Sequence, residues 1–376
     1  MNIGLYVHIP FCQQKCFYCD FPSFAGKESL QGAYMAALNK EIIIQSGYAY
    51  NVVDSIFIGG GTPTLLSEKM LSDLLESLNK NFKLAQNVEI SIEANPGTID
   101  KSKLQVLFNR GVNRLSFGVQ SFNDEVLKKC GRIHNENQAK RTVCEAQEVG
   151  FRNINVDLMY GLPEQTLEIL KESLFQALEL KVQHLSIYGL KIEEDTLFEK
   201  WISEDKLILP DDEVEDDMYE LINSLLPANG FRRYEISNYC KEGFECKHNL
   251  KYWHYDNYLG LGAGAHSLIY PKRQSNIAEV EKYIKKLQEG ELALNEIVTV
   301  DKSSAMEEFC FLALRTTSGI NINKFNGFFE ADFNNIYGIK VNKLINMGLL
   351  QKNDIHIFLT SKGRKYGNVV FAEFLL

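Results

Sequence analysis

The chain of 376 residues lacks several features that would place it in a common class of proteins. No apolar stretch approaches the roughly 20 residues that a helix needs to cross a bilayer. No charged segment leads into an apolar one at the N-terminus, as in a secretory signal. Runs of basic residues are also missing, and the formal net charge is −9. Because sequence-independent nucleic-acid binding depends on Lys and Arg that neutralise phosphates, we expect no nucleic-acid partner. These absences predict a soluble protein of the cytoplasm.

Cysteine is present, but not in the pattern of a disulfide framework. Three of the eight cysteines lie in "HIPFCQQKCFYCDF", where Cys12, Cys16 and Cys19 have the spacing C-x3-C-x2-C. The other five are scattered: Cys130, Cys144, Cys240, Cys246 and Cys310. In a reducing compartment a tight group of thiols is more often a metal site than a set of disulfides. We expect the scattered cysteines to behave as small buried residues.

Segments rich in Ile, Val, Leu, Phe or Tyr alternate with helical patterns up to about residue 193. The predicted strands cover residues 3–9, 53–61, 88–96, 114–122, 153–163 and 184–193. Ser67 is placed to cap the helix that follows the second strand, and the segment "TLEILKESLFQALEL" carries leucines on one helical face. Such strand–helix units in series predict a parallel sheet covered by helices. Since a closed TIM barrel needs about eight units, we predict an α/β fold with an open, partial (β/α)6 barrel.

Glycines and polar residues gather at the carboxyl ends of these predicted strands. "GGGTPT" follows the second strand, Glu93 and Gln120 lie at the ends of the third and fourth, and Asp157 lies in the fifth. In parallel α/β folds the carboxyl ends of the strands meet at one edge, which carries the connecting loops and the active site. Together with the cysteine loop after the first strand, these residues predict a functional site there. Taken singly, each polar residue is ordinary, and the glycines would indicate only a tight turn.

The rest of the chain has a different pattern. An acidic helix start, "PDDEVEDDMYELI", precedes a segment rich in aromatic residues and glycine. We predict a first domain over residues 1–275, including the loop "HNLKYW" at 248–253, and a mainly helical domain over residues 295–376. The second reads as helix, β-hairpin and helix, which resembles a winged helix. That pattern suits DNA binding or partner docking, and the acidic charge favours docking.

Three thiols at positions i, i+4 and i+7 of one loop can converge on a metal centre. Zinc would take a fourth protein ligand, and the nearest candidates, His8 and Asp20, give no familiar zinc spacing. An iron–sulfur cluster held by three cysteines would leave one iron open to an outside ligand. The spacing favours the cluster and keeps zinc as the alternative.

The spacing C-x3-C-x2-C, with an aromatic residue directly before the last cysteine, resembles the signature of the radical S-adenosylmethionine (SAM) superfamily. The resemblance implies a [4Fe–4S] cluster on Cys12, Cys16 and Cys19, with SAM on the open iron. Further motifs occur in the order found in oxygen-independent coproporphyrinogen III oxidases and the related HemW-type heme chaperones. They are "YVHIPFC", "GGGTPT", "SIEANP", "RLSFGVQSF", "GRIHN", "DLMYGLPEQT", "YEISNY", "HNLKYW" and "LGLGAGAHS". This resemblance spans nearly the whole chain and implies the same barrel and C-terminal helical domain.

The resemblance also implies a set of SAM-binding residues. They are Tyr6, Tyr18, Gly60, Gly61, Thr62, Glu93, Gln120, Arg132 and Asp157. A glycine backbone lets the amino-acid part of SAM approach closely, a carboxylate suits ribose hydroxyls, and Arg suits a carboxylate. In the oxidases a second SAM lies near the position of Tyr18.

Two departures separate this chain from the oxidase pattern. The oxidases carry a further cysteine two residues after the third, where this sequence has Phe21. They also have an extension before the cysteine loop, whereas here the first predicted strand starts at about residue 3. "HNLKYW" instead matches the H-N-x-x-Y-W motif of the heme chaperones. His248 is a chemically sensible axial ligand of heme iron, and Tyr252 and Trp253 suit a porphyrin face. The alternative for His248 is a capping or core-edge histidine in an aromatic loop.

The resemblance therefore implies a heme chaperone that keeps the cluster and SAM and delivers heme to an acceptor protein, with the membrane as one place of delivery. The alternative is an oxygen-independent coproporphyrinogen III oxidase of porphyrin biosynthesis, which uses SAM-derived radicals. The sequence carries the radical SAM machinery in both cases and leaves enzymatic activity open. Expected partners are heme or another porphyrin and the heme acceptor, with a homodimer as a further option.

Overall fold

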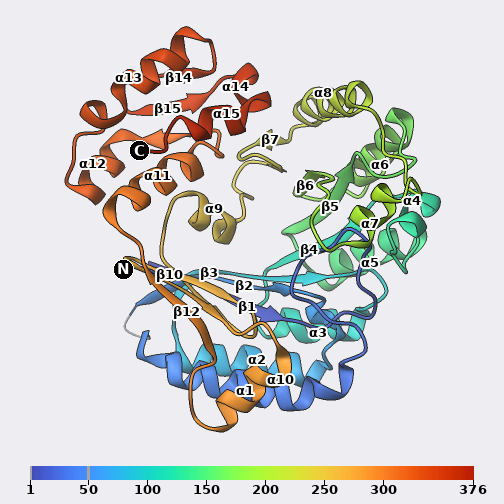
Figure 1. Ribbon diagram of the computed structural model, residues 1–376. Helices are drawn as coiled ribbons and strands as arrows, with labels where there is room; N and C mark the ends of the chain where they lie inside the picture. Colours follow the sequence, from blue (N-terminus) through green and yellow to red (C-terminus); the bar gives the residue numbers. More distant parts are fainter. Residues whose placement is uncertain (1, 49–50) are drawn as a thin grey trace.

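The computed structural model describes residues 2–48 and 51–376, and its central element is a curved, twelve-stranded sheet (Figure 1). Parallel strands form its middle in chain order. They are β1 (Asn2–Ile9), β2 (Val52–Gly60), β3 (Lys83–Ala94), β4 (Arg114–Gln120), β5 (Ile154–Tyr160) and β6 (His184–Gly189). The predicted α/β fold with six parallel strands is confirmed. β5 and β6 end at residues 160 and 189, earlier than expected, because the chain turns at Gly161 with a positive φ of 73° and at the loop after Gly189.

Helices cover the outer face of this sheet, because each strand alternates apolar residues toward them. Along β1, Ile3, Leu5 and Val7 are buried in the main core, whereas Tyr6 faces the opposite side. The covering helices are α1 (Gln31–Gln45), α2 (Glu68–Asn81), α3 (Lys101–Asn109), α4 (Asp124–Lys129), α5 (Glu136–Val149), α6 (Leu167–Glu179), α8 (Asp212–Ala228) and α10 (Val280–Gln288). α7 (Leu197–Ser203) packs instead against the cysteine loop, where Phe198 N–H donates to the Phe17 carbonyl at 3.0 Å. The predicted cap of α2 is present, since Ser67 Oγ accepts the backbone N–H of Met70 at 3.2 Å.

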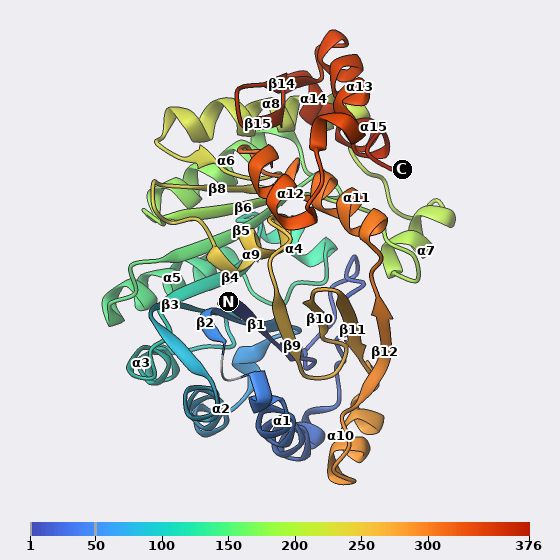
Figure 2. The same cartoon turned by 90° about the vertical axis from the view of Figure 1, so that its left-hand side faces the viewer.

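Further strands extend the sheet beyond both ends of the parallel set. β9 (Tyr258–Leu261) pairs in parallel with β1, and the antiparallel strands β10 (His266–Ile269), β11 (Lys272–Asn276) and β12 (Leu294–Thr299) follow it (Figure 2). Beyond β6 lie β8 (Asn238–Cys240) and β7 (Arg232–Arg233). The sheet therefore ends in two edge strands, β12 and β7, and does not close into a barrel.

The C-terminal part has a hydrophobic core of its own, which includes Phe325, Phe333, Tyr337 and Phe374. Its elements are α11 (Lys302–Ala313), β13 (Ile320–Asn321), α12 (Ile322–Phe329), α13 (Phe333–Asn346), β14 (Leu350–Lys352), β15 (His356–Leu359), α14 (Ser361–Lys365) and α15 (Gly367–Ala372). The expected order of helix, hairpin and helix is found here. The domain boundary near residue 295 stays a prediction, and β12 on its C-terminal side pairs with the main sheet.

One short helix, α9 (Lys247–Trp253), lies inside the curve of the sheet and contacts both β2 and α11 (Figure 1). Two features of the sheet make room for it. The register between β1 and β2 skips Asp54, so this residue forms a bulge, and its carboxylate pairs with Lys251 of α9 at 2.6 Å. A Cβ on Gly4 would lie 2.8 Å from the Lys251 side chain. In the described part of the chain, no helix is long and apolar enough to span a bilayer.

Candidate functional site

A cavity of about 430 Å³ lies within the curve of the sheet, and all six parallel strands contribute to its wall. This size falls in the range of about 300–1,000 Å³ that is usual for small-molecule sites. The cysteine loop and α9 complete the lining. Every residue that the sequence assigned to the cluster, to SAM or to heme lines this cavity, except Trp253. The cavity thus brings together side chains that are as far apart in sequence as Tyr6 and Tyr252.

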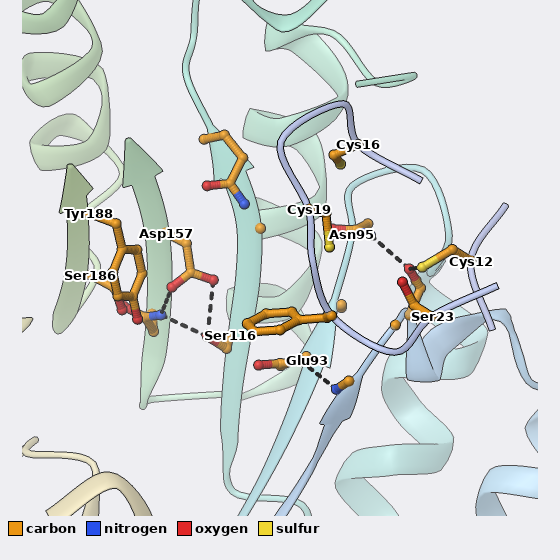
Figure 3. Close-up of a pocket in the computed structure, with 18 of the residues that line it drawn as sticks. Cys12, Cys16, Cys19, Ser23, Glu93, Asn95, Ser116, Asp157, Ser186 and Tyr188 are labelled. Atoms are coloured by element: carbon orange, nitrogen blue, oxygen red, sulfur yellow. Dashed lines mark hydrogen bonds between the residues drawn. The ribbon is translucent and has the colours of Figure 1, made fainter. Parts of the chain in front are cut away.

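The three cysteines lie on the loop that follows β1, at one side of the cavity (Figure 3). Backbone hydrogen bonds fix this loop, from Cys12 N–H to the Phe24 carbonyl at 3.0 Å and from Phe17 N–H to the Cys130 carbonyl at 3.1 Å. The Arg132 guanidinium donates to Cys16 Sγ at 3.1 Å. The loop therefore presents its thiols to a cavity that already contains a compensating cation.

The thiols fit a [4Fe–4S] cluster better than a zinc ion. Within residues 2–48 and 51–376, no three His, Cys, Asp or Glu side chains converge on one point, as a single ion requires. The nearest histidine is occupied, since His8 Nδ1 bonds to Tyr6 Oη at 3.0 Å and His8 Nε2 to the Pro22 carbonyl at 3.0 Å. A cluster holds its cysteines on different irons and accepts a wider spread. Arg132 beside Cys16 also suits the negative charge of a thiolate-bound cluster.

The glycine turn after β2 lies directly against the cysteine loop. Gly61 N–H donates to the Ile9 carbonyl at 2.9 Å, and Thr62 N–H donates to the Phe11 carbonyl at 2.7 Å. A Cβ on Gly61 would lie 2.6 Å from the Phe11 carbonyl oxygen and 3.0 Å from Cys12 Sγ. The turn must therefore be glycine at this position if Cys12 is to keep its place.

We expect Gly61→Ala to displace Cys12 and to lower the iron content of the reconstituted protein to well below that of wild type. The overpacking should also reduce the free energy of unfolding by about 1–3 kcal/mol. Iron per chain and urea denaturation measure the two effects. Gly32→Ala is the matched control, because its Cβ meets nothing within 4 Å and lies in helix α1. Normal iron content in Gly61→Ala would contradict the close approach.

The pKa values of both carboxyl groups in the cavity wall are raised. Burial and the neighbouring Asp157 raise the pKa of Glu93 to about 8, although Gly60 N–H donates to Glu93 Oε2 at 3.0 Å. Burial also raises the pKa of Asp157, against the effect of hydrogen bonds such as that from Asn155 Nδ2 to Asp157 Oδ1 at 2.7 Å. Below pH 8, Glu93 therefore mostly carries a proton, and the cavity is more positive than its residue count suggests.

Several lining residues were missed by sequence reasoning: Ser23, Asn95, Arg114, Ser116, Asn155, Ser186 and Tyr188. Asn95 connects two predicted residues, since its Nδ2 donates to Thr62 Oγ1 at 2.9 Å and its Oδ1 accepts from Arg132 Nη2 at 2.7 Å. Its signal was present in "SIEANP", two positions after Glu93. Ser116 and Asn155 lie near the amino ends of β4 and β5, so a search confined to the carboxyl ends of strands could not find them.

His248 is fully buried and has partners on both ring nitrogens. Nδ1 bonds to Ser55 Oγ at 3.0 Å, and Nε2 bonds to Tyr252 Oη at 2.8 Å. The ring also stacks on Phe57, with centroids 5.5 Å apart. Burial, followed by the charges of Lys251 and Arg114, lowers the pKa of His248 to about 3, so the imidazole is neutral at pH 7.

Trp253 lies on the other side of α9 and does not share the cavity with His248 and Tyr252. Its ring faces the C-terminal part, where the guanidinium of Arg315 lies 5.4 Å from the ring centroid. The "HNLKYW" segment therefore does not present all its aromatic residues to one ligand. His248, Asn249 and Tyr252 face the cavity, and Trp253 contacts α11 and its surroundings.

Comparison with known proteins gives two family matches. Residues 6–177 match the "Radical SAM superfamily", and residues 300–366 match the "HemN C-terminal domain". The first match begins within β1, contains the cysteine loop and β2 to β5, and ends within α6, and the second contains most of the C-terminal core.

Curated relatives are similar over most of the chain. The sequence is 39% identical to "Heme chaperone HemW" of Bacillus subtilis over 98% of both chains. It is 45% identical to the protein of that name from Escherichia coli, over 71% of this chain and 70% of the relative. Among solved structures, coproporphyrinogen III oxidase (HemN) from Escherichia coli, described as a radical SAM enzyme, superposes with a TM-score of 0.87 at 26% identity. That superposition covers 100% of this chain and 90% of the other.

Proposed function

Because the chain belongs to the HemW family within the radical SAM superfamily, we propose that it is a heme chaperone that binds heme and passes it to acceptor proteins. One observation of the site carries this proposal. A neutral imidazole, His248, lies in the wall of the same cavity as the three cysteines. Neutral imidazole is the form of histidine that ligates heme iron.

Membership of the superfamily implies a [4Fe–4S] cluster and SAM. When bound, the cluster would supply an electron, and SAM would accept it. In the proposal, Cys12, Cys16 and Cys19 hold the cluster, and Arg132 offsets the charge on Cys16. Gly60 and Gly61 line the cavity, and their backbone is the proposed contact for the amino-acid part of SAM. The space that a side chain would need is already taken by His8 and by the Phe11 carbonyl. Tyr6, Tyr18, Thr62, Glu93, Gln120 and Asp157 complete the proposed SAM wall.

Glu93 has a defined part in this arrangement. With a pKa of about 8 it is mostly protonated near neutral pH, and it already accepts the N–H of Gly60. A cationic amino group of a bound ligand would lower this pKa, so that Glu93 releases its proton as the ligand binds. Asn95 keeps Thr62 and Arg132 in place on either side.

His248 can ligate iron only after Nε2 leaves the hydroxyl of Tyr252. The Nδ1 bond to Ser55 then orients the ring, as hydrogen bonds of this kind do for metal-binding histidines. Tyr252 would remain beside the porphyrin. Trp253 packs under Arg315 instead, so we assign it to the docking of α9 rather than to the heme face.

The test separates heme transfer from porphyrin oxidation. Reconstituted protein is loaded with heme under anaerobic conditions and mixed with apo-protein of a heme acceptor, and transfer is followed by the Soret band. In parallel, coproporphyrinogen III, SAM and a reductant are supplied. We expect heme transfer without multiple turnovers to protoporphyrinogen. Sustained formation of protoporphyrinogen without heme transfer would instead establish the oxidase.

A further inference from the structure

Arg114 is a buried cation in the cavity wall, and its guanidinium is incompletely hydrogen-bonded. It is the first residue of β4, and its side chain is 1% exposed. In the described structure, its Nε and Nη1 atoms have no hydrogen-bond partner. Its ionisable neighbours, in order of their effect on it, are Cys246, Glu89, Tyr234 and Asp157. Burying a charge without a close partner costs several kcal/mol, so an unpaired guanidinium facing a cavity points to a missing anion.

Arg114 lies at the opposite end of the cavity from the cysteines. Along β4, residues 114, 116, 118 and 120 face the same side, and Gly118 is level with Asp157. The guanidinium of Arg132 binds the Gly118 carbonyl. Arg114 lies four positions before Gly118 in β4, which is a distance of about 13 Å along a strand. Arg132 donates to Cys16 and Asn95, and of its buried nitrogens Nε has no partner in the described residues. Arg114 has two such nitrogens, Nε and Nη1, for a ligand.

The surroundings of Arg114 are suited to an anion beside the imidazole. Ser116 and Asn155, paired between β4 and β5, and Asn249 and Tyr252 of α9 line the same cavity and carry polar groups. Arg114 lies close enough to His248 to lower the pKa of its ring. Burial raises the pKa of Glu93 and of Asp157, which weakens both as anions. Glu89, the other carboxyl group near Arg114, already accepts the backbone N–H groups of Lys247 and His248.

We propose that Arg114 binds a propionate carboxylate of the heme whose iron is held by His248. The inference rests on the proposed heme-binding function and adds a second point of attachment to it. Arginine suits this task because its planar guanidinium can form two parallel hydrogen bonds with a carboxylate. With the iron on His248 and one propionate on Arg114, the porphyrin has a fixed orientation in the cavity.

The experiment compares heme with its dimethyl ester, in which both propionates are uncharged. Each is titrated into the full-length reconstituted protein and followed at the Soret band. We expect wild type to bind heme roughly tenfold to a hundredfold more tightly than the ester, the range for a hydrogen bond to a charged group. Arg114→Gln should lose this preference by weakening heme binding and leaving ester binding unchanged. Arg114→Lys should keep part of it.

Arg110→Gln is the matched control, since Arg110 is exposed and pairs with Glu76 at the surface. Its preference for heme over the ester should equal that of wild type. Equal affinity of wild type for heme and ester would overturn the role of Arg114, even if Arg114→Gln failed to fold. An equal loss for both ligands in Arg114→Gln would assign the residue to the fold instead. If neither ligand bound wild type, the proposed function would fail, and this inference with it.

Discussion

Cys16→Ala should abolish the visible absorbance of the reconstituted iron–sulfur cluster. Cys16 is one of the three thiols that the loop presents to the cavity. In the described residues no fourth cysteine lines that cavity to replace it. Its loss also leaves Arg132 without the sulfur that it contacts at 3.1 Å. The change replaces a partly buried side chain at a loop position, so the secondary structure should remain. Absorbance, iron per chain and far-ultraviolet circular dichroism measure these effects.

Two other cysteines provide controls. Cys144→Ala alters an exposed residue of α5, and Cys130→Ala alters a buried residue whose backbone carbonyl, not its thiol, holds Phe17. Both variants should keep the full cluster spectrum. A full spectrum in Cys16→Ala, or a lost one in Cys144→Ala, would refute the assignment of the ligands.

The second large effect concerns heme. His248→Ala should reduce heme binding to the background level, because the axial ligand is removed and the cavity wall offers no other imidazole in the described residues. A pKa of about 3 means that protons do not compete with iron for His248 at ordinary pH. The heme affinity of wild type should therefore stay constant between pH 8 and pH 5. With an exposed histidine as the ligand, the heme affinity would decrease as the pH falls through about 6.5. Soret titrations at several pH values give both results.

Tyr252→Phe distinguishes ligation from a general loosening of α9. It removes the hydroxyl that bonds to Nε2 at 2.8 Å but keeps the ring and its edge-on contact with His248. The competing hydrogen bond has a net value of about 0.5–1.5 kcal/mol, so heme affinity should rise a few-fold. If Tyr252→Phe and His248→Ala lowered affinity alike, His248 would be a structural residue of α9. Retention of cluster absorbance in both variants confirms that the chain is folded.

Much of the parallel sheet could be predicted because the relevant signals are local. Runs such as "VDSIFIGGG" combine β-branched residues with a glycine end, and Ser67 marks the start of α2. The convergence of Glu93, Gln120 and Asp157 was also predictable, since the carboxyl ends of parallel strands share one edge. The cysteine spacing identified the kind of centre, and a phenylalanine after Cys19 indicated the branch.

The remainder depends on contacts between distant segments. The pairing of β9 with β1 joins residues about 250 positions apart, and no local pattern encodes it. Arg114 looks like an ordinary charged residue before the apolar strand "LSFGV", although the fold buries it. The burial of His248 cannot be inferred from "HNLKYW" itself, and the bulge at Asp54 cannot be inferred from the sequence of β2. Both depend on how α9 packs against β1 and β2. Trp253 faces away from the cavity for the same reason.

The way in which α9 is held has a consequence for the kinetics of heme capture. This helix has only seven residues, which is too few for it to be stable alone. It is held in place by side-chain contacts, including that of Glu89, which accepts the backbone N–H groups of Lys247 and His248. It can therefore open locally while the sheet stays intact. In the proposed function, heme reaches Nε2 of His248 in this opened state, and the observed rate of capture should then reach a ceiling as the heme concentration rises. That ceiling is the opening rate of α9, so the strength of these few attachments sets the speed of loading as well as the stability of the loaded state.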